Sequence, residues 1–222
     1  MEKSEYFLRF QQMCIDILAK SGNCAESQSF FRNATTVPEL VSAWKRYWAG
    51  LLHEVPELVI DAFRKNYDIY RKDINLAAVY YNEAPPATAS VSIVLVGNSD
   101  QNWNNLTSML AINGRHRVYV LGNHDVKVEG ACNVFVNADD ARVRLYDSCR
   151  ANLKKGIVWA KDRSVVNGKG HVVCYDATTI KAFGGIVEDY GHQSIDAYND
   201  TVVRTSINKR ITLHDKAQIV LL

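Results

Sequence analysis

Three residues near the C-terminal end of the sequence could support acid–base chemistry. His192 lies in a predicted turn, three residues after Asp189 and four residues before Asp196. A carboxylate beside an imidazole orients the ring and stabilises its protonated form, so such a pair can act as a general base. If the protein is an enzyme, we expect His192 with Asp189 or Asp196 to be its catalytic site.

Further carboxylates occupy predicted turns, where aspartate commonly has a structural role. Two carboxylates that converge on one face of a fold can hydrolyse a glycosidic bond. The residues concerned are Asp139, Asp140, Asp147, Asp162, Asp176 and Asp215. Because they are mostly turn residues, we expect them to stabilise the fold.

The spacing of the histidines and cysteines does not favour a metal site. Structural zinc sites usually contain two ligands that lie two to five residues apart. Of the candidates, only His171 and Cys174 approach this spacing, and we expect Cys132 and Cys149 at different corners of the fold. No nucleotide-binding or nucleophile-elbow motif is present. We therefore predict no metal and no cofactor.

Composition limits the partners and the location. The formal net charge of the 222 residues is only +2, which does not favour nucleic acid as a partner. No apolar run is long enough for a transmembrane helix, so we expect no membrane association. Five cysteines at irregular spacing favour reduced thiols in a cytoplasm over a disulfide framework.

Residues 1–86 have the periodicity of an α-helical domain that ends in a linker. Helices are predicted near residues 38–53, 56–66 and 68–80, and Thr36 with Glu39 can form a capping box. Trp44 and Trp48 lie four residues apart beside Lys45 and Arg46, a cluster that could contact nucleic acid. Helical spacing favours a buried aromatic seam for the two tryptophans.

Residues 87–222 show a different period. A triplet of apolar, any and apolar residues recurs about every eight positions from Val118 to Leu221, with glycine, asparagine and aspartate between triplets. All four prolines lie at or before Pro86, as expected if the strands that follow are paired on both sides. The pattern predicts a parallel β-helix, or β-solenoid, with about three units in a coil of about 24 residues. An antiparallel sandwich of short hairpins is the alternative.

Several repeats contain an apolar residue, tyrosine, aspartate and a small residue, as in Leu145–Ser148 and Cys174–Ala177. In this they resemble poorly characterised β-solenoid proteins of gut Bacteroidetes-type bacteria and of their phages and mobile elements. The resemblance covers about residues 117–222 and implies an architecture with a bacterial or phage origin. A virion-associated location is therefore an alternative to the cytoplasm, and the resemblance implies no catalytic residues.

Three units per coil would place four large or charged side chains on one outer face. These residues are Phe135, Trp159, Lys181 and Arg204. Phe135 and Trp159 are 24 residues apart, so they would stack on adjacent coils. Such a surface could bind a protein partner, a sugar or a single-stranded nucleic acid, although the N-terminal helices or a second subunit could also cover it.

The given sequence ends in an apolar strand, which would expose an unpaired edge of the solenoid. Ile219, Val220, Leu221 and Leu222 are therefore the expected self-association residues. We predict a non-enzymatic structural or protein-interaction module that forms a homo-oligomer. The alternative is a β-helix enzyme, either acyltransferase-like or carbohydrate-active, that uses His192 and nearby carboxylates.

Overall fold

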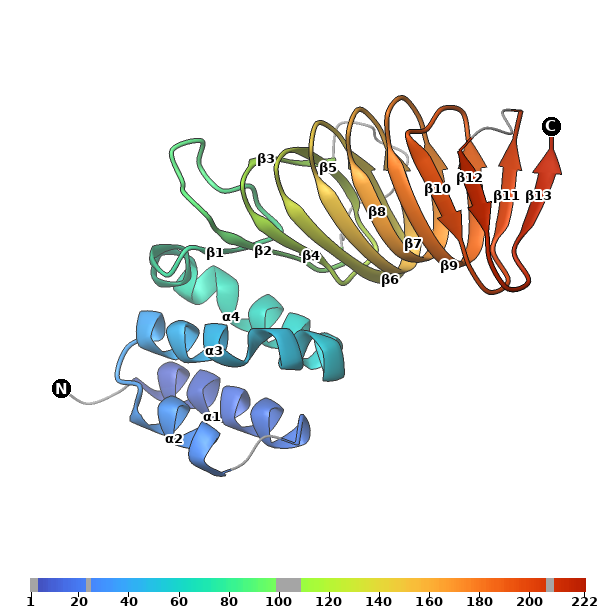
Figure 1. Cartoon of the computed structure of the whole chain (residues 1–222). Coiled ribbons are helices and arrows are strands. Elements are labelled where there is room, and N and C mark those ends of the chain that lie inside the picture. The colour runs from blue at the N-terminus through green and yellow to red at the C-terminus, as the bar shows by residue number, and fades with distance from the viewer. Residues whose placement is uncertain (1–3, 23–24, 99–108, 207–209) are drawn as a thin grey trace. The chain divides into compact units, whose positions relative to one another are not determined.

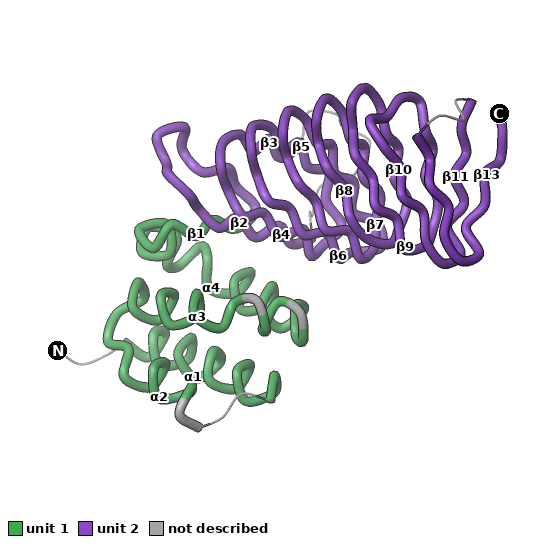
Figure 2. The backbone as a smooth tube through the Cα atoms, in the orientation of Figure 1, with its two compact units in different colours: residues 1–81 green, residues 82–222 purple. Residues whose placement is uncertain are grey.

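The computed structural model describes residues 4–22, 25–98, 109–206 and 210–222. The chain forms two compact units, Met1–Tyr81 and Asn82–Leu222 (Figure 2). The first unit contains the helices and the second contains the solenoid. The boundary follows Tyr81, whereas the predicted helical domain and linker ended at Pro86.

The helical unit contains α1 (Glu5–Lys20), α2 (Ala25–Asn33), α3 (Val37–Glu54), α4 (Pro56–Leu76) and the short strand β1 (Val79–Tyr81) (Figure 1). Thr36 and Glu39 form the predicted capping box at the start of α3. The pKa of Glu39 is lowered because Thr35 and Thr36 donate hydrogen bonds to its carboxylate. The two helices predicted near residues 56–66 and 68–80 form one element, α4, in which Tyr70 has a non-helical backbone.

Trp44 and Trp48 form the buried aromatic seam that their spacing favoured. They are 1% and 4% exposed, and their rings meet Phe63 edge-on at 5.3 and 6.1 Å. Their rings are therefore not available to stack on a nucleic acid base.

The second unit is a parallel β-solenoid (Figure 1). Its strands are β2 (Ile93–Val96), β3 (Leu110–Gly114), β4 (Arg117–Val120), β5 (Asp125–Gly130), β6 (Asn133–Leu145), β7 (Arg150–Ala160), β8 (Val165–Cys174), β9 (Thr179–Asp189), β10 (Ser194–Ala197), β11 (Val202–Thr205), β12 (Ile211–Leu213) and β13 (Gln218–Leu221). Parallel pairs join these strands from one coil to the next, for example β6 with β7 and β7 with β8. The predicted α-helical domain followed by a β-solenoid is therefore confirmed, and the antiparallel alternative is wrong.

The prediction of three units per coil is wrong, because each coil contains two. Val118 pairs with Val134, sixteen residues later, and Val134 pairs with Ala151, seventeen later. Farther along, Val165 pairs with Thr179, fourteen residues later. An eight-residue step gives the spacing of strands but does not say how many corners close a coil, so the repeat alone left this number open.

Two units per coil give the solenoid two faces. The first face consists of β2, β4, β10, β12 and the first halves of β6, β7, β8 and β9. The second face consists of β3, β5, β11, β13 and the second halves of the same four strands. Side chains alternate between the interior and the outer surface, and the interior is filled mainly by valine, leucine, isoleucine and alanine.

The chain turns at two kinds of corner. At the aspartate corner, Asp147, Asp162 and Asp176 adopt the left-handed conformation, with φ between 55° and 59°. At the glycine corner, Gly156, Gly170 and Gly185 recur at the same interval of about one coil. In these coils the two corners therefore use different residue types, and they alternate along the chain.

The last coil described contains β12 and β13. Among the described strands, β12 pairs with β10 alone and β13 pairs with β11 alone. The interior-facing side chains of this coil are only partly covered, since Leu213 is 40% exposed and Leu221 is 65% exposed. Within the described strands, the coil thus presents partly exposed apolar side chains along the edge opposite β10 and β11.

Candidate functional site

The four residues of the predicted binding surface lie on different faces. Phe135 pairs with Tyr119 and Asn152 on the first face, where Lys181 also lies. Trp159 and Arg204 lie on the second face. Their placement on one face, with Phe135 stacked on Trp159, is therefore wrong, because sorting by every third unit mixes the two faces.

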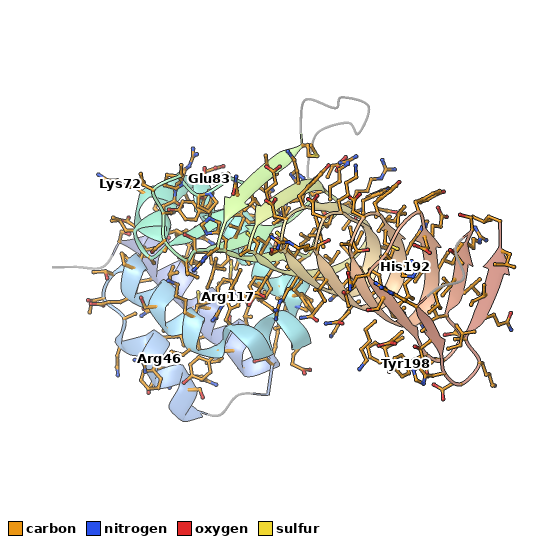
Figure 3. The ribbon with its side chains drawn as sticks, turned by 45° about the horizontal axis from the view of Figure 1, so that its top comes forward. Arg46, Lys72, Glu83, Arg117, His192 and Tyr198 are labelled. Atoms are coloured by element: carbon orange, nitrogen blue, oxygen red, sulfur yellow. The ribbon has the colours of Figure 1, made fainter. Side chains whose placement is uncertain are left out.

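On the first face, Phe135 belongs to a small aromatic group. Its ring lies 6.2 Å from that of Tyr119, and the ammonium of Lys154 lies 5.6 Å from the ring centre of Phe135. Lys181 contributes to a separate stack farther along the solenoid. Phe183 stacks on Tyr198 at 5.1 Å, Tyr198 stacks on His214 at 4.2 Å, and Lys181 lies over the first two rings. Tyr198 projects from the edge of the solenoid (Figure 3).

Trp159 lines a groove of about 150 Å³ on the second face. We call it the aromatic–cationic groove, and its lining residues are Arg144, Tyr146, Trp159, Lys161 and Tyr175. Arg144 and Trp159 are register partners on β6 and β7, and the other three residues follow the strand ends at the aspartate corner. The groove therefore runs along the solenoid axis, between two rows of outward-facing side chains.

Cations and rings alternate along one wall of this groove. Lys127 and Lys161 each lie over the ring of Tyr146, at 5.2 and 5.8 Å from its centre. Lys161 also lies 5.2 Å from the ring centre of Tyr175, whose ring stacks on Tyr190 at 5.3 Å. On the opposite wall, Arg144 lies over the ring of Trp159 at 5.5 Å. In contacts of this kind the cation is attracted to the electron-rich face of the ring.

The sequence pattern identified one of these groove residues, Trp159, as a binding residue and missed the other four. Tyr146 and Tyr175 belong to the repeats Leu145–Ser148 and Cys174–Ala177. Lys161 takes the tyrosine position in the intervening coil, since Ala160-Lys161-Asp162 aligns with Leu145-Tyr146-Asp147. Aligning the aspartate turns with one another would have placed these residues in one row.

The structure brings together two of the three candidate catalytic residues. Nδ1 of His192 lies 2.9 Å from Oδ2 of Asp189. Asp196 lies on β10 in register with Lys181, on the outer surface of the first face, and takes no part in this pair. His192 and Asp189 are therefore neighbours, whereas Asp196 does not join them.

The His192–Asp189 pair is enclosed within the solenoid. The two side chains are 3% and 0% exposed. The hydroxyl of Thr205 donates to Asp189 at 2.6 Å, and the backbone N–H of Gly191 donates to it at 3.0 Å. The thiol of Cys174 also donates to Asp189, and burial raises the pKa of that thiol, with a further rise from the nearby carboxylate. A substrate cannot reach the pair in this arrangement, which resembles a satisfied buried network.

The turn aspartates stack on one another along their corner. Asp162 accepts a hydrogen bond from the backbone N–H of Asp147 at 2.8 Å, and Asp176 accepts one from Asp162 at 3.2 Å. Asp215 accepts a similar bond from Asn199 at the other corner. These carboxylates therefore join successive coils, as their expected structural role requires.

The cysteines also differ from expectation in their placement. Cys132 and Cys149 lie at the same corner on adjacent coils, because they directly precede the register partners Asn133 and Arg150. Both are buried, and a hydrogen bond between the thiols raises the pKa of Cys149. No group of three or more possible metal ligands occurs within the described part of the chain.

Comparison of the chain with protein-family models, curated proteins and solved structures finds no match. None of the helices within the described ranges has both the length and the apolar character needed to cross a membrane. The proposed function therefore rests on the structure of the chain.

Proposed function

We propose that this chain is a non-enzymatic protein-interaction module that self-associates through the last coil of its solenoid. The observation that carries the proposal is the edge formed by β12 and β13. There Leu213, Leu221 and Leu222 are 40%, 65% and 71% exposed, although the first two face the interior of the coil. An apolar strand edge of this kind favours pairing with another chain.

A second copy of the chain is the occupant that this edge suits. A two-fold arrangement places the same apolar coil of each copy against the other, so the patch is complementary to itself. Ile219 and Val220 lie on the same strand, so the four residues expected to self-associate all belong to this edge region.

The alternative function, a β-helix enzyme, rests on the short distance between His192 and Asp189. Two observations favour the interaction module over it. The pair is almost completely buried, and Thr205 and Gly191 already occupy the carboxylate with hydrogen bonds. The turn aspartates that could serve carbohydrate chemistry accept backbone hydrogen bonds from neighbouring coils.

The resemblance of the repeats to those of Bacteroidetes-type and phage solenoids supports a bacterial cytoplasm or a virion as the location of the module. It also makes a phage or mobile-element origin part of the proposal. A protein is the partner class we propose beside self-association, in keeping with the formal charge of +2.

Self-association is tested by light scattering on the wild-type chain and on Leu221→Asp. We expect the wild type to be a dimer or larger, and the variant to lose at least half of that mass. A buried aspartate at a self-complementary edge introduces two unpaired charges per contact. Because Leu221 is mostly exposed in the single chain, the variant should keep its circular dichroism spectrum.

Asn152→Asp is the matched control, because Asn152 is an exposed residue in the middle of the first face. It adds the same charge far from the edge and should leave the mass unchanged. A wild-type monomer, or equal masses for the wild type and Leu221→Asp, would contradict the proposal.

A further inference from the structure

We infer that the aromatic–cationic groove binds a carboxylate side chain from an acidic, extended segment of a partner protein. This inference rests on the proposed role as a protein-interaction module but not on self-association. It concerns a surface on the second face, at the corner formed by Tyr146, Lys161 and Tyr175.

The size of the groove limits what it can hold. Its volume of about 150 Å³ matches a cavity that accepts one benzene-sized group. Pockets that enclose a whole small-molecule ligand are usually about 300–1,000 Å³. The groove therefore suits a single side chain anchored from a larger partner.

The charges in the groove favour an anion. Its lining contains two cations, Arg144 and Lys161, and no carboxylate. Arg144 already forms an ion pair with Asp125. Lys161 lies between two tyrosine rings, and within the described residues no carboxylate lies at ion-pair distance from its ammonium. A carboxylate from a partner would supply the missing counter-ion.

The nearby turn aspartates do not supply this counter-ion. Asp162 directly follows Lys161, but its carboxylate accepts the backbone N–H of Asp147. Asp176 likewise accepts the N–H of Asp162. These carboxylates are held along the corner and stabilise the stacking of the coils.

The rings of Tyr146 and Tyr175 already have cations or a second ring over them, which argues against a nucleic acid base or a sugar ring stacked on these tyrosines. Lys127 and Lys161 lie over the ring of Tyr146, and Lys161 and Tyr190 lie over the ring of Tyr175. Bases and pyranoses bind aromatic residues through open ring faces. Ring edges, hydroxyls and ammonium groups remain available, and these suit a carboxylate, because aromatic edges carry partial positive charge.

The direction of the groove suits an extended segment. Arg144 and Trp159 form one row, and Tyr146, Lys161 and Tyr175 form the other, each row following the solenoid axis across successive coils. An extended peptide that lies along these rows can place a glutamate between Arg144 and Lys161. Arginine, tryptophan and tyrosine are also the residue types that dominate the energetics of protein interfaces.

The test uses fluorescein-labelled poly-L-glutamate and measures its binding to the full chain by fluorescence anisotropy. We expect Lys161→Gln to weaken binding about fivefold or more, in line with the loss of a charge-assisted contact. Lys161→Arg should restore most of the affinity. The control is Lys169→Gln, which removes the same charge from an exposed lysine at the glycine corner and should change binding little.

Equal weakening by Lys161→Gln and Lys169→Gln would overturn the inference, because binding would then follow net charge. Tighter, Lys161-dependent binding of labelled oligothymidylate would also overturn it and would identify a single-stranded nucleic acid as the ligand. The Leu221→Asp variant should bind poly-L-glutamate like the wild type. Failure of the groove and failure of the oligomerisation edge are thereby distinguished.

Discussion

Asp189 occupies a position at which earlier coils carry apolar or weakly polar side chains. Its register equivalents are Leu145, Ala160 and Cys174, and the next coil has Thr205. A buried carboxylate is tolerated only when its hydrogen-bonding capacity is satisfied. Here His192, Thr205 and Gly191 satisfy it, so this network replaces apolar packing in the last coils.

We therefore predict that Asp189→Ala lowers the free energy of unfolding by about 3 kcal/mol or more, because it removes the buried carboxylate that accepts from Thr205 and lies beside His192. Asp196→Ala, which removes the same charge from the outer surface of β10, should change it by less than about 0.5 kcal/mol. Urea unfolding followed by circular dichroism measures both. Similar values for the two variants would show that the buried network does not stabilise the solenoid.

The sequence contained the signal for this burial. Alternation along β9 places Val187 in the interior and therefore Asp189 as well, two residues later. The short spacing made Asp189 and Asp196 equal candidates for the neighbour of His192. What spacing could not predict was enclosure, because it depends on Cys174 and Thr205 from the adjacent coils. Those contacts require the register, which the repeat alone did not supply.

At the scale of the elements, the glycine corner shows why the coils can be so short. Gly168 has φ +140°, and a Cβ atom there would lie 1.8 Å from the carbonyl oxygen of Leu153. Gly185 is similar, with a Cβ position 2.2 Å from the carbonyl oxygen of Gly170. The backbones of adjacent coils approach so closely that any side chain at these positions would collide with the preceding coil.

We predict that Gly168→Ala destabilises the solenoid by about 2 kcal/mol or more, through both the collision and the unfavourable φ. The comparison variant is Gly50→Ala in α3, where, apart from the neighbouring residues and the backbone of the helix, no described atom lies within 4 Å of the new Cβ. That change should stabilise the helical unit by about 0.5–1 kcal/mol, since alanine is the better helix former. Thermal unfolding of both variants checks the prediction, which fails if Gly168→Ala is as stable as the wild type.

The elements themselves were largely predictable, because their signals are local. Helical periodicity and the Thr36 capping box located α3, and the eight-residue step located the strands. The residue types at the corners also indicate how many units form a coil. Asp147, Asp162 and Asp176 recur at intervals of 15 and 14 residues, and Gly156, Gly170 and Gly185 of the opposite corner each follow one of them. Two alternating corner types imply two units per coil.

At the scale of the whole molecule, the number of units per coil determines every surface. With three units, Phe135 and Trp159 would share a face, whereas with two they lie on opposite faces. The wrong number of units per coil therefore led to a predicted binding surface that combined residues from both faces. The same error prevented prediction of the groove. Neighbouring residues in each row of the groove are about 15 positions apart, which is one coil.

Removing one whole coil tests this architecture directly. In a solenoid each coil contacts mainly its neighbours, so a coil can be deleted and the rest can restack. Val165 pairs with Thr179, so deletion of residues 165–178 removes one coil of fourteen residues. We expect that variant to keep a β-type circular dichroism spectrum and cooperative urea unfolding. The interior-facing side chains before and after the deletion would still be in register with one another.

Deletion of residues 165–172 removes only about one of the two units and provides the contrast. It would place a strand of the first face beside strands of the second face, which run in the opposite direction around the coil. The apolar interior row would then be broken at every later coil, and we expect loss of cooperative unfolding. Tolerance of a 24-residue deletion, residues 165–188, together with failure of the fourteen-residue deletion, would favour three units per coil and contradict the two-sided solenoid.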